Sequence, residues 1–309
     1  MKDGSQCDRA ESTPMTAYRR AVDADLPAAW DVFYQNEVRD DPNPPPRGEV
    51  PAYLRHVLRT GAVYVAEWDD AIVAFAAAIT RDNVAYLTDL FVRPDEQSSG
   101  IGQTLLGHVM PTDGRIHCTV SSTDPRALAL YVRHGMQPRW PHVNLRLNGP
   151  FRSPLPVSAV EVEVEVARPG DPDLVAWDAA VGGRSRPEDH AFWVREQRGV
   201  PLWFRRRGNV VGYGYVRLGA GSLQYPNVCT IGPVGVASSD DAVACVLATV
   251  DYASRNADVL RIHLPGPHRS LAPLLELGFH ITYLETFVSS ASGQFFYPTY
   301  YVTSGADLF

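Results

Sequence analysis

The chain has 309 residues, and its 28 lysines and arginines against 35 aspartates and glutamates give a formal net charge of −7. This charge argues against nucleic acid or an anionic membrane as the main partner, and it is compatible with a positively charged small molecule. The composition, 45% hydrophobic and 20% charged, is that of an ordinary globular protein. A chain of this length is expected to form about two domains, each long enough to bury a core.

The cysteines and the beginning of the chain favour a reduced, cytoplasmic protein. No two cysteines form a C-x-x-C pair, and Cys118, Cys229 and Cys245 lie among apolar residues. The first residues are polar and lack the apolar core of an export signal, so residues 1–15 are predicted to be a disordered tail. No apolar run approaches the roughly 18 residues of a membrane span, and no membrane partner is expected.

Residues 16–148 alternate between strand and helix patterns. Apolar residues spaced by three and four after Asp23, the expected N-cap, predict a first helix, and a Pro-rich loop over 40–46 follows it. Asp69 and Asp70 between two apolar runs predict a hairpin. The predicted strands cover 17–22, 62–68, 72–79, 84–92, 115–120 and 142–147, and the predicted helices cover 23–34, 50–59, 101–110 and 124–134.

A second domain, over residues 159–309, is predicted to follow a Pro-rich linker over 149–158. It repeats the order of the first, with strands over 160–167, 200–204, 210–218, 228–236 and 259–264 and helices over 174–181, 240–253 and 271–277. The fold class is therefore α/β or α+β, with two tandem domains, each a mixed, mainly antiparallel sheet flanked by helices.

The strongest functional signal is a strand, turn, glycine loop and helix over residues 87–109. Gly100 and Gly102 lack Cβ atoms, so a bulky anion can approach the backbone closely. The first N–H groups of the helix have no partner inside it, and the helix dipole favours negative charge there. Gln97 adds a side-chain amide donor. The pattern predicts a pyrophosphate site, and its alternative is a plain strand-to-helix turn.

Two sequence blocks then resemble the GNAT superfamily of N-acetyltransferases over residues 16–148. Gln97, Gly100 and Gly102 match its acetyl-CoA motif, Q/R-x-x-G-x-G/A, after a strand that ends in Val-Arg-Pro. Residues 124–136 resemble its N-x-x-A-x-x-x-Y-x-x-x-G-F segment, with Asp124 in place of asparagine and Met136 in place of phenylalanine. The interpretation is thus of two tandem GNAT-like domains, the first of which binds acetyl-CoA.

The resemblance implies how acetyl-CoA is held. The strand over 85–92 separates from the strand over 115–120, and the pantetheine arm pairs with the backbone of Phe91 and Val92. An N–H near these residues stabilises the oxyanion. The implied cofactor-binding residues are Phe91, Val92, Gln97, Ser98, Ser99, Gly100, Ile101, Gly102, Gln103 and Asp124.

The resemblance also implies the catalytic groups. Tyr131 matches the tyrosine that protonates the departing thiolate, with simple packing as its alternative. Asp89, two residues before Phe91, is the candidate base, with a structural carboxylate or a water chain as alternatives. In a multi-acetylating group of this superfamily a C-terminal phenylalanine carboxylate serves as base, so Phe309 is a further candidate, against a terminal strand that only docks.

The acceptor is expected to be a primary amine of a small molecule, at a pocket edged by Tyr34, Glu37, Asp40 and Asp41. In the second half, Asp241 and Ala244 stand where Gln97 and Gly100 stand in the first. The acidic side chain repels a pyrophosphate, so this half is interpreted as a degenerate domain that covers the slot and shapes the acceptor pocket.

Other interpretations stay open. A non-catalytic acyl-CoA-binding or sensing protein needs the same loop, and a mycothiol-synthase-like tandem acetyltransferase has a similar length. No metal is expected, because the spacing of the histidines His108, His117, His134 and His142 does not fit a metal site. The sequence leaves a homodimer open.

Overall fold

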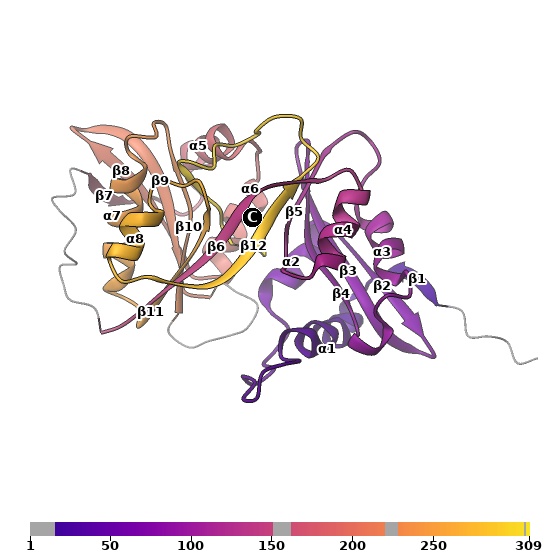
Figure 1. Cartoon of the computed structure of the whole chain (residues 1–309). Helices are drawn as coiled ribbons and strands as arrows, with labels where there is room; N and C mark the ends of the chain where they lie inside the picture. The colour runs from indigo at the N-terminus through magenta and orange to yellow at the C-terminus, as the bar shows by residue number, and fades with distance from the viewer. Residues whose placement is uncertain (1–15, 151–161, 220–227, 306) are drawn as a thin grey trace, which may run out of the picture.

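A computed structural model describes residues 16–150, 162–219, 228–305 and 307–309. The tail predicted over 1–15 and most of the predicted linker lie outside the described residues. Figure 1 shows two halves, each with helices against a sheet, joined by strands that run between them. Among the described residues, no helix is both long enough and apolar enough to cross a membrane.

The first half has the predicted order of elements. They are β1 (Ala17–Arg20), α1 (Leu26–Glu37), α2 (Ala52–Thr60), β2 (Ala62–Trp68), β3 (Ala71–Arg81), β4 (Val84–Val92), α3 (Ile101–Val109), β5 (Ile116–Ser121), α4 (Pro125–Arg133) and β6 (Gln137–Asn148). Asp23 is not the N-cap of α1 as expected. A short 3-10 turn over Asp23–Asp25 comes first, where the Asp25 carboxylate accepts from the Val22 N–H at 2.8 Å.

The second half contains two elements that the sequence did not indicate, α6 and β12. Its elements are β7 (Glu163–Val166), α5 (Pro172–Gly182), α6 (Pro187–Glu196), β8 (Gly199–Arg206), β9 (Asn209–Arg217), β10 (Val228–Val236), α7 (Ala242–Ser254), β11 (Val259–Pro265), α8 (Leu271–Glu276), β12 (His280–Ser289) and β13 (Tyr301–Val302). Cys118, Cys229 and Cys245 are buried free thiols, as expected.

The two halves exchange their last strands. The described strands form one sheet, in the order β1-β2-β3-β4-β5-β12-β6-β11-β10-β9-β8-β7, with β13 beside β10. Strand β12 of the second half lies between β5 and β6, and β6 of the first half lies between β12 and β11, all antiparallel (Figure 1). Strand β6 was expected to close the first half. Instead, each half completes the sheet of the other.

A shared core follows from this exchange. Trp30 and Phe75 of the first half and Trp193 and Tyr213 of the second belong to one cluster of buried apolar side chains. Two further clusters lie mainly within one half each. The two halves are therefore packed as one unit, and the interior between them is formed by residues from both.

Charged groups are also buried between the halves. Asp189 of α6 accepts hydrogen bonds from His56 of α2 at 2.7 Å and from Arg81 of β3 at 2.9 Å. Burial alone raises the pKa of a carboxyl, but these donors hold the pKa of Asp189 at about 2. Removing one member of such a group leaves a buried charge without its partner, which is costly. The contact fixes α6 against the first half.

Candidate functional site

Strands β4 and β5 separate in the middle of the sheet. Their parallel pairing runs from Val84 with Ile116 to Tyr86 with Cys118, and then stops. At the fork, the Thr119 hydroxyl donates to the Leu87 carbonyl at 2.8 Å. The opposite edge of β4 stays paired with β3, with a bulge at Thr88. The edge of β4 that faces β5 is thus open beyond Leu87, as predicted for a slot that accepts an extended ligand.

A cavity of about 1350 Å³ opens at this slot. Its lining includes the predicted residues Asp89, Phe91, Val92, Gln97, Ser98, Gly100, Gly102, Gln103, Asp124 and Tyr131. Ser99 and Ile101 do not line it. The Ser99 hydroxyl donates to the Glu96 carbonyl at 2.6 Å, and the Ile101 side chain packs in the core. These two residues can contribute backbone N–H groups but not side chains.

The glycine loop has the shape expected of an anion site. Gly100 is the N-cap of α3 with φ of +89°, and a Cβ on it meets no atom within 4 Å. A Cβ on Gly102 meets only ordinary contacts, with Val92 at 3.6 Å. The first helical bond of α3 joins the Thr104 N–H to the Gly100 carbonyl, so the preceding N–H groups have no partner inside the helix. These groups lie beside the cavity, where a phosphate suits them.

Gln97, which is predicted to donate to the pyrophosphate, lines the cavity and hydrogen-bonds within the protein. Its amide nitrogen donates to Asn36 Oδ1 at 2.9 Å and to the Val92 carbonyl at 3.2 Å, so both donors are used within the protein. Gln97 thus ties the loop to α1 and to the end of β4. Its amide oxygen accepts from Arg126 Nη2 at 3.0 Å.

Arg126 is a candidate that the sequence interpretation missed. It is paired with Asp124, the N-cap of α4, at 2.7 Å, and its side chain is 57% exposed at the edge of the cavity. The pairs with Asp124 and Gln97 hold a guanidinium near the N-terminus of α3. Its place two residues after Asp124 in the second block was the available signal. No sequence signal pointed to Asn36, because it lies 61 residues before Gln97, its hydrogen-bond partner.

Asp89 is a buried carboxylate that faces the cavity. Tyr53 and Thr88 each donate a hydroxyl hydrogen bond to it at 2.7 Å. Burial raises the pKa of Asp89 to about 6, although both hydrogen bonds lower it. The carboxylate is therefore oriented by its neighbours, titrates near neutral pH and retains lone pairs for a further donor.

Tyr131 of α4 also lines this cavity. Its side chain is nearly buried, and its hydroxyl makes no hydrogen bond to the described residues. Burial, together with Asp89 and Asp124, raises the pKa of Tyr131 above its ordinary value. The phenol is therefore protonated at neutral pH and can donate a hydrogen bond into the cavity.

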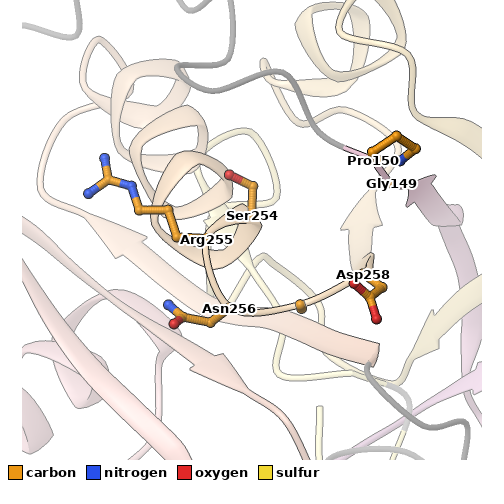
Figure 2. Close-up of a pocket in the computed structure, with 7 residues that line it drawn as sticks. Gly149, Pro150, Ser254, Arg255, Asn256 and Asp258 are labelled. Carbon is orange, nitrogen blue, oxygen red and sulfur yellow. The ribbon is translucent and has the colours of Figure 1, made fainter.

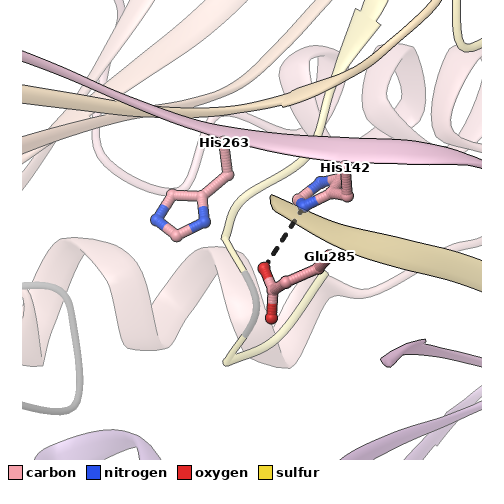
Figure 3. Close-up of side chains that lie close together, drawn as sticks. All are labelled: His142, His263 and Glu285. Atoms are coloured by element: carbon pink, nitrogen blue, oxygen red, sulfur yellow. Dashed lines mark ion pairs between the residues drawn. The ribbon is translucent and has the colours of Figure 1, made fainter. Parts of the chain in front are cut away.

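Strands β6, β11 and β12 contribute Asn144, His263 and Glu285 to the lining of the cavity. Figure 3 shows His263 and Glu285 with their neighbour His142. Glu285 of β12 is paired in register with His142 of β6, and its carboxylate accepts from Asn144 at 2.8 Å. His263 of β11 completes a group whose ligand atoms lie within 4.8 Å of one another, a spacing that can hold a metal ion. The members come from three strands, so no spacing in the sequence predicts the group.

Phe309, the further candidate base, lies in the core and does not line the cavity. Its ring is buried and stacks on Tyr86 at 5.1 Å. Its main-chain oxygen accepts hydrogen bonds from Arg184 and Arg186, both buried. Because two guanidinium groups stabilise negative charge there, the group is a poor proton acceptor. The nearby Asp307, and not Phe309, lines the cavity.

The corresponding slot of the second half is filled by the chain itself. Strands β10 and β11 pair in parallel from Val228 to Ile231 and then separate, as β4 and β5 do. Strand β13 lies there, with Val302 paired to Val234 of β10. Docking of a terminal strand was the alternative interpretation for this segment. The position that corresponds to the predicted pantetheine site of the first half is occupied here by a peptide.

Another hollow, of about 700 Å³, lies at the C-terminal end of β6 (Figure 2). It is lined by Gly149, Pro150 and the turn between α7 and β11. The Gly149 N–H donates to the Asp258 carbonyl at 2.8 Å, and Arg255 pairs with Asp251 on its own helix. None of the predicted site residues lies there.

Known proteins share this architecture. Residues 30–136 match the model of the acetyltransferase (GNAT) family, and no curated protein sequence matches the chain. A structure from Pyrococcus horikoshii, assigned as an acetyltransferase, is similar with a TM-score of 0.69 at 18% identity, over 93% of this chain and 92% of that one. A tandem GNAT protein from the clavulanic acid biosynthesis pathway is similar with a TM-score of 0.62 at 15% identity, over 91% of this chain and 99% of that one.

A GCN5-related N-acetyltransferase from Sphaerobacter thermophilus is similar with a TM-score of 0.60 at 17% identity, over 92% of this chain and 98% of that one. At these identities the likeness shows the fold, and it extends over both halves. The family match covers the forked strands, the glycine loop and Tyr131. Residues 30–136 therefore match the acetyltransferase (GNAT) family model, and both halves together have a fold similar to that of a tandem GNAT protein.

Proposed function

We propose that this protein transfers an acetyl group from acetyl-CoA to a primary amine of a small molecule, by direct attack in a ternary complex. The observation that carries the proposal is one cavity that joins the open edge of β4, the N-terminus of α3, Asp89 and Tyr131. Acetyl-CoA supplies an activated acetyl group on a thiol leaving group. The residues present fit it, because Gly100 leaves open space beside unpaired N–H groups.

Binding divides between backbone and side chains. The N–H groups at the start of α3 and the guanidinium of Arg126 suit the pyrophosphate. The open edge of β4 around Phe91 and Val92 suits the amide groups of the pantetheine arm, which is added like a further strand. The Val92 carbonyl already accepts from Asn36 and Gln97, so the pairing at this position relies on the other backbone groups of the edge.

Asp89 is the base in this proposal. An amine is protonated in neutral solution and cannot attack until it loses a proton. A carboxylate whose pKa is about 6 is ionised above that pH and can accept the proton, while Tyr53 and Thr88 hold it in place. Its pKa is closer to neutral than that of an ordinary aspartate, which makes it the better base.

Tyr131 is the acid in this proposal. The sulfur leaves with negative charge, and a protonated phenol in the cavity can donate to it. The raised pKa of Tyr131 keeps the phenol protonated, so that its hydroxyl can stabilise the departing sulfur with a hydrogen bond. No covalent link to the protein is needed, since the amine and the acetyl group meet within one cavity.

Turnover with a panel of primary amines, followed by release of free thiol, tests the proposal. Acetyl-CoA binding is measured in parallel by calorimetry. Thiol release that depends on the amine supports the enzyme. Tight binding without thiol release for any amine indicates instead a non-catalytic acyl-CoA-binding protein, which is the alternative function.

Other expectations accompany this proposal. A mycothiol-synthase-like reaction is the competing enzyme, and there the productive motif belongs to the second half, whereas β13 fills the second slot here. A cytoplasmic location and the absence of nucleic-acid and membrane partners stay predictions, and a homodimer stays open.

A further inference from the structure

The wall that the exchanged strands add to the cavity is polar and comes from both halves. Asn144, His263 and Glu285 line it, from β6, β11 and β12 in turn. The antiparallel register sets Glu285 opposite His142 and His263 opposite Asn144, so these side chains share one face of the sheet. The wall exists only because β12 enters between β5 and β6.

Carboxylates converge on this part of the cavity. The acidic residues concerned are Glu37, Asp89, Glu285 and Asp307. Among the described residues, none of them forms an ion pair with arginine or lysine. Asp89 accepts from hydroxyl groups, Glu285 accepts from the Asn144 amide, and Asp307 accepts from Gln197 at 3.5 Å. The hydrogen bonds to these carboxylates thus come from neutral donors, while Arg217 lies close enough to Asp307 for their charges to interact, and Arg146 and Arg261 also line the cavity.

These carboxylates affect one another. Desolvation raises the pKa of Glu37, and the charges of Glu285 and Asp89 raise it further. Asp307 adds to the effect of burial on Asp89. Like charges that share a site of low polarity repel, and a cation placed among them relieves that repulsion.

An independent observation points to a ligand at the same wall. His142 is fully buried, and its Nδ1 has no hydrogen-bond partner among the described residues, although it faces the Glu285 carboxylate at 3.8 Å (Figure 3). His263 Nδ1 also lacks such a partner. Burial and the neighbouring Arg261 hold the pKa of His263 well below its ordinary value, so its ring is neutral and does not balance the carboxylates. Buried polar atoms of this kind usually have a partner, and a ligand in the cavity can supply one to His263, which lines the cavity.

We propose that the acceptor carries two positive charges, one on the amine that is acetylated beside Asp89 and one on a second cationic group bound by Glu285 and Asp307. This inference rests on the proposed function and names its acceptor class, a small diamine or polyamine. The second half thereby contributes the specificity, through the exchanged strand that carries Glu285 and the terminal segment that carries Asp307.

A matched pair of amines tests the acceptor class. The probes are 1,4-diaminobutane and butylamine, which differ by one amino group, in thiol-release assays with saturating acetyl-CoA. The diamine is expected to have a KM lower by about tenfold or more, which corresponds to one charge-assisted contact. Equal KM values for both amines overturn the inference and leave the proposed function intact.

The variant Glu285→Gln removes the charge of this side chain and keeps its shape, so it tests whether the charge binds the second cationic group. The amide can still accept from Asn144, so the fold is kept, and the KM for the diamine should rise by about tenfold while that for butylamine stays the same. Glu163→Gln, an exposed substitution on β7 outside the cavity, is the matched control and should change neither value. A variant that raises both KM values alike assigns Glu285 a structural role and overturns the inference.

Calorimetry of the full chain in the presence of CoA distinguishes this inference from the proposed function. If the diamine binds but no thiol is released with any amine, the acetyl transfer fails while the cationic site stands. The competing occupant is a metal ion at His142, His263 and Glu285. Binding of Zn²⁺ alone, with no binding of the diamine, overturns the inference.

Discussion

The Tyr53 hydroxyl on α2 donates a hydrogen bond of 2.7 Å to the Asp89 carboxylate on β4, and both side chains are buried. The bond joins the helical layer to the strand at the bulge, next to the fork of the sheet. Thr88, the extra residue of the bulge, donates to the other carboxylate oxygen. A buried acid is thus fixed in direction and ionised near neutral pH. Its titration is the property that experiments can follow.

Asp89→Asn should lower kcat/KM by about a hundredfold or more, as expected on loss of a general base. In the wild-type protein the rate should fall as the pH drops through about 6, because the protonated carboxyl cannot accept a proton. This acidic limb should be absent from the variant. An identical limb in both proteins assigns the titration to another group.

The same variant should be more stable at neutral pH. The folded pKa of Asp89, about 6, lies above the ordinary value of 3.8, so ionisation destabilises the fold progressively as the pH rises between these values. Above pH 7 the cost is about 2 to 3 kcal/mol, which an uncharged amide avoids in large part. Denaturant unfolding at pH 5 and pH 8 measures it. A variant that is less stable at pH 8 shows that the carboxylate is structural.

Tyr53→Phe should shift the pH profile without removing it. The phenol stabilises the ionised carboxylate, so its loss raises the pKa of Asp89 above about 6 and moves the acidic limb to higher pH. The plateau rate should change little. Tyr34→Phe is a matched control, because Tyr34, which was expected to edge the acceptor pocket, does not line the cavity, and its hydroxyl donates to the Pro45 carbonyl. If Tyr53→Phe lowers the plateau rate but leaves the acidic limb at the same pH, Tyr53 does not set the pKa of Asp89.

The first half could be predicted from sequence because its signals are local. The stripe of α1, the hairpin between β2 and β3 and the glycine loop before α3 each lie within a short window. The exchange of β6 and β12 could not be predicted in this way. Thr286 of β12 pairs with Ser121 of β5, a residue far earlier in the chain, and the first half of β12 is exposed and lacks a clear alternation. Pairing over such separations leaves no periodic signal.

The residues of the site also differ in whether a local sequence pattern indicates them. Tyr131 and Asp89 could be placed because they lie at fixed positions in motifs that also fix the local backbone. The interaction of Gln97 with Asn36 and the group of His142, His263 and Glu285 could not, since each joins separate elements. The part of the cavity lined by Asp89 and Tyr131 was therefore predicted, while the wall formed by β6, β11 and β12 was not.

Tyr131→Phe should lower kcat by about a hundredfold with little change in acetyl-CoA affinity, because only the departing sulfur needs the hydroxyl proton. Calorimetry measures the affinity for acetyl-CoA, and steady-state kinetics measure kcat. Tyr64→Phe is a suitable control, since Tyr64 stacks on His108 at 5.1 Å and does not line the cavity. An unchanged rate for Tyr131→Phe shows that Tyr131 packs in the core and takes no part in catalysis.

Arg126→Gln should raise the KM for acetyl-CoA by roughly two- to fivefold and leave kcat unchanged, as expected for one exposed charge beside a phosphate. Because the guanidinium is exposed, the effect should shrink at high salt. Arg255→Gln, an exposed arginine paired with Asp251 on α7, is the control. A fall in kcat without a change in KM places Arg126 outside cofactor binding.

The exchanged strands predict that the two halves fold together. Residues 1–150 alone lack β12, so β5 and β6 lose the strand between them, and the shared core loses Trp193 and Tyr213. We expect this fragment to be unfolded or aggregated when expressed alone, because unpaired strand edges and exposed apolar surface promote association. Coexpression with residues 151–309 should restore a soluble complex. The full chain should unfold in a single transition, with coincident tryptophan fluorescence and circular dichroism. Two separate transitions, or a folded and monomeric first half, contradict this view and support domains that are independent of each other.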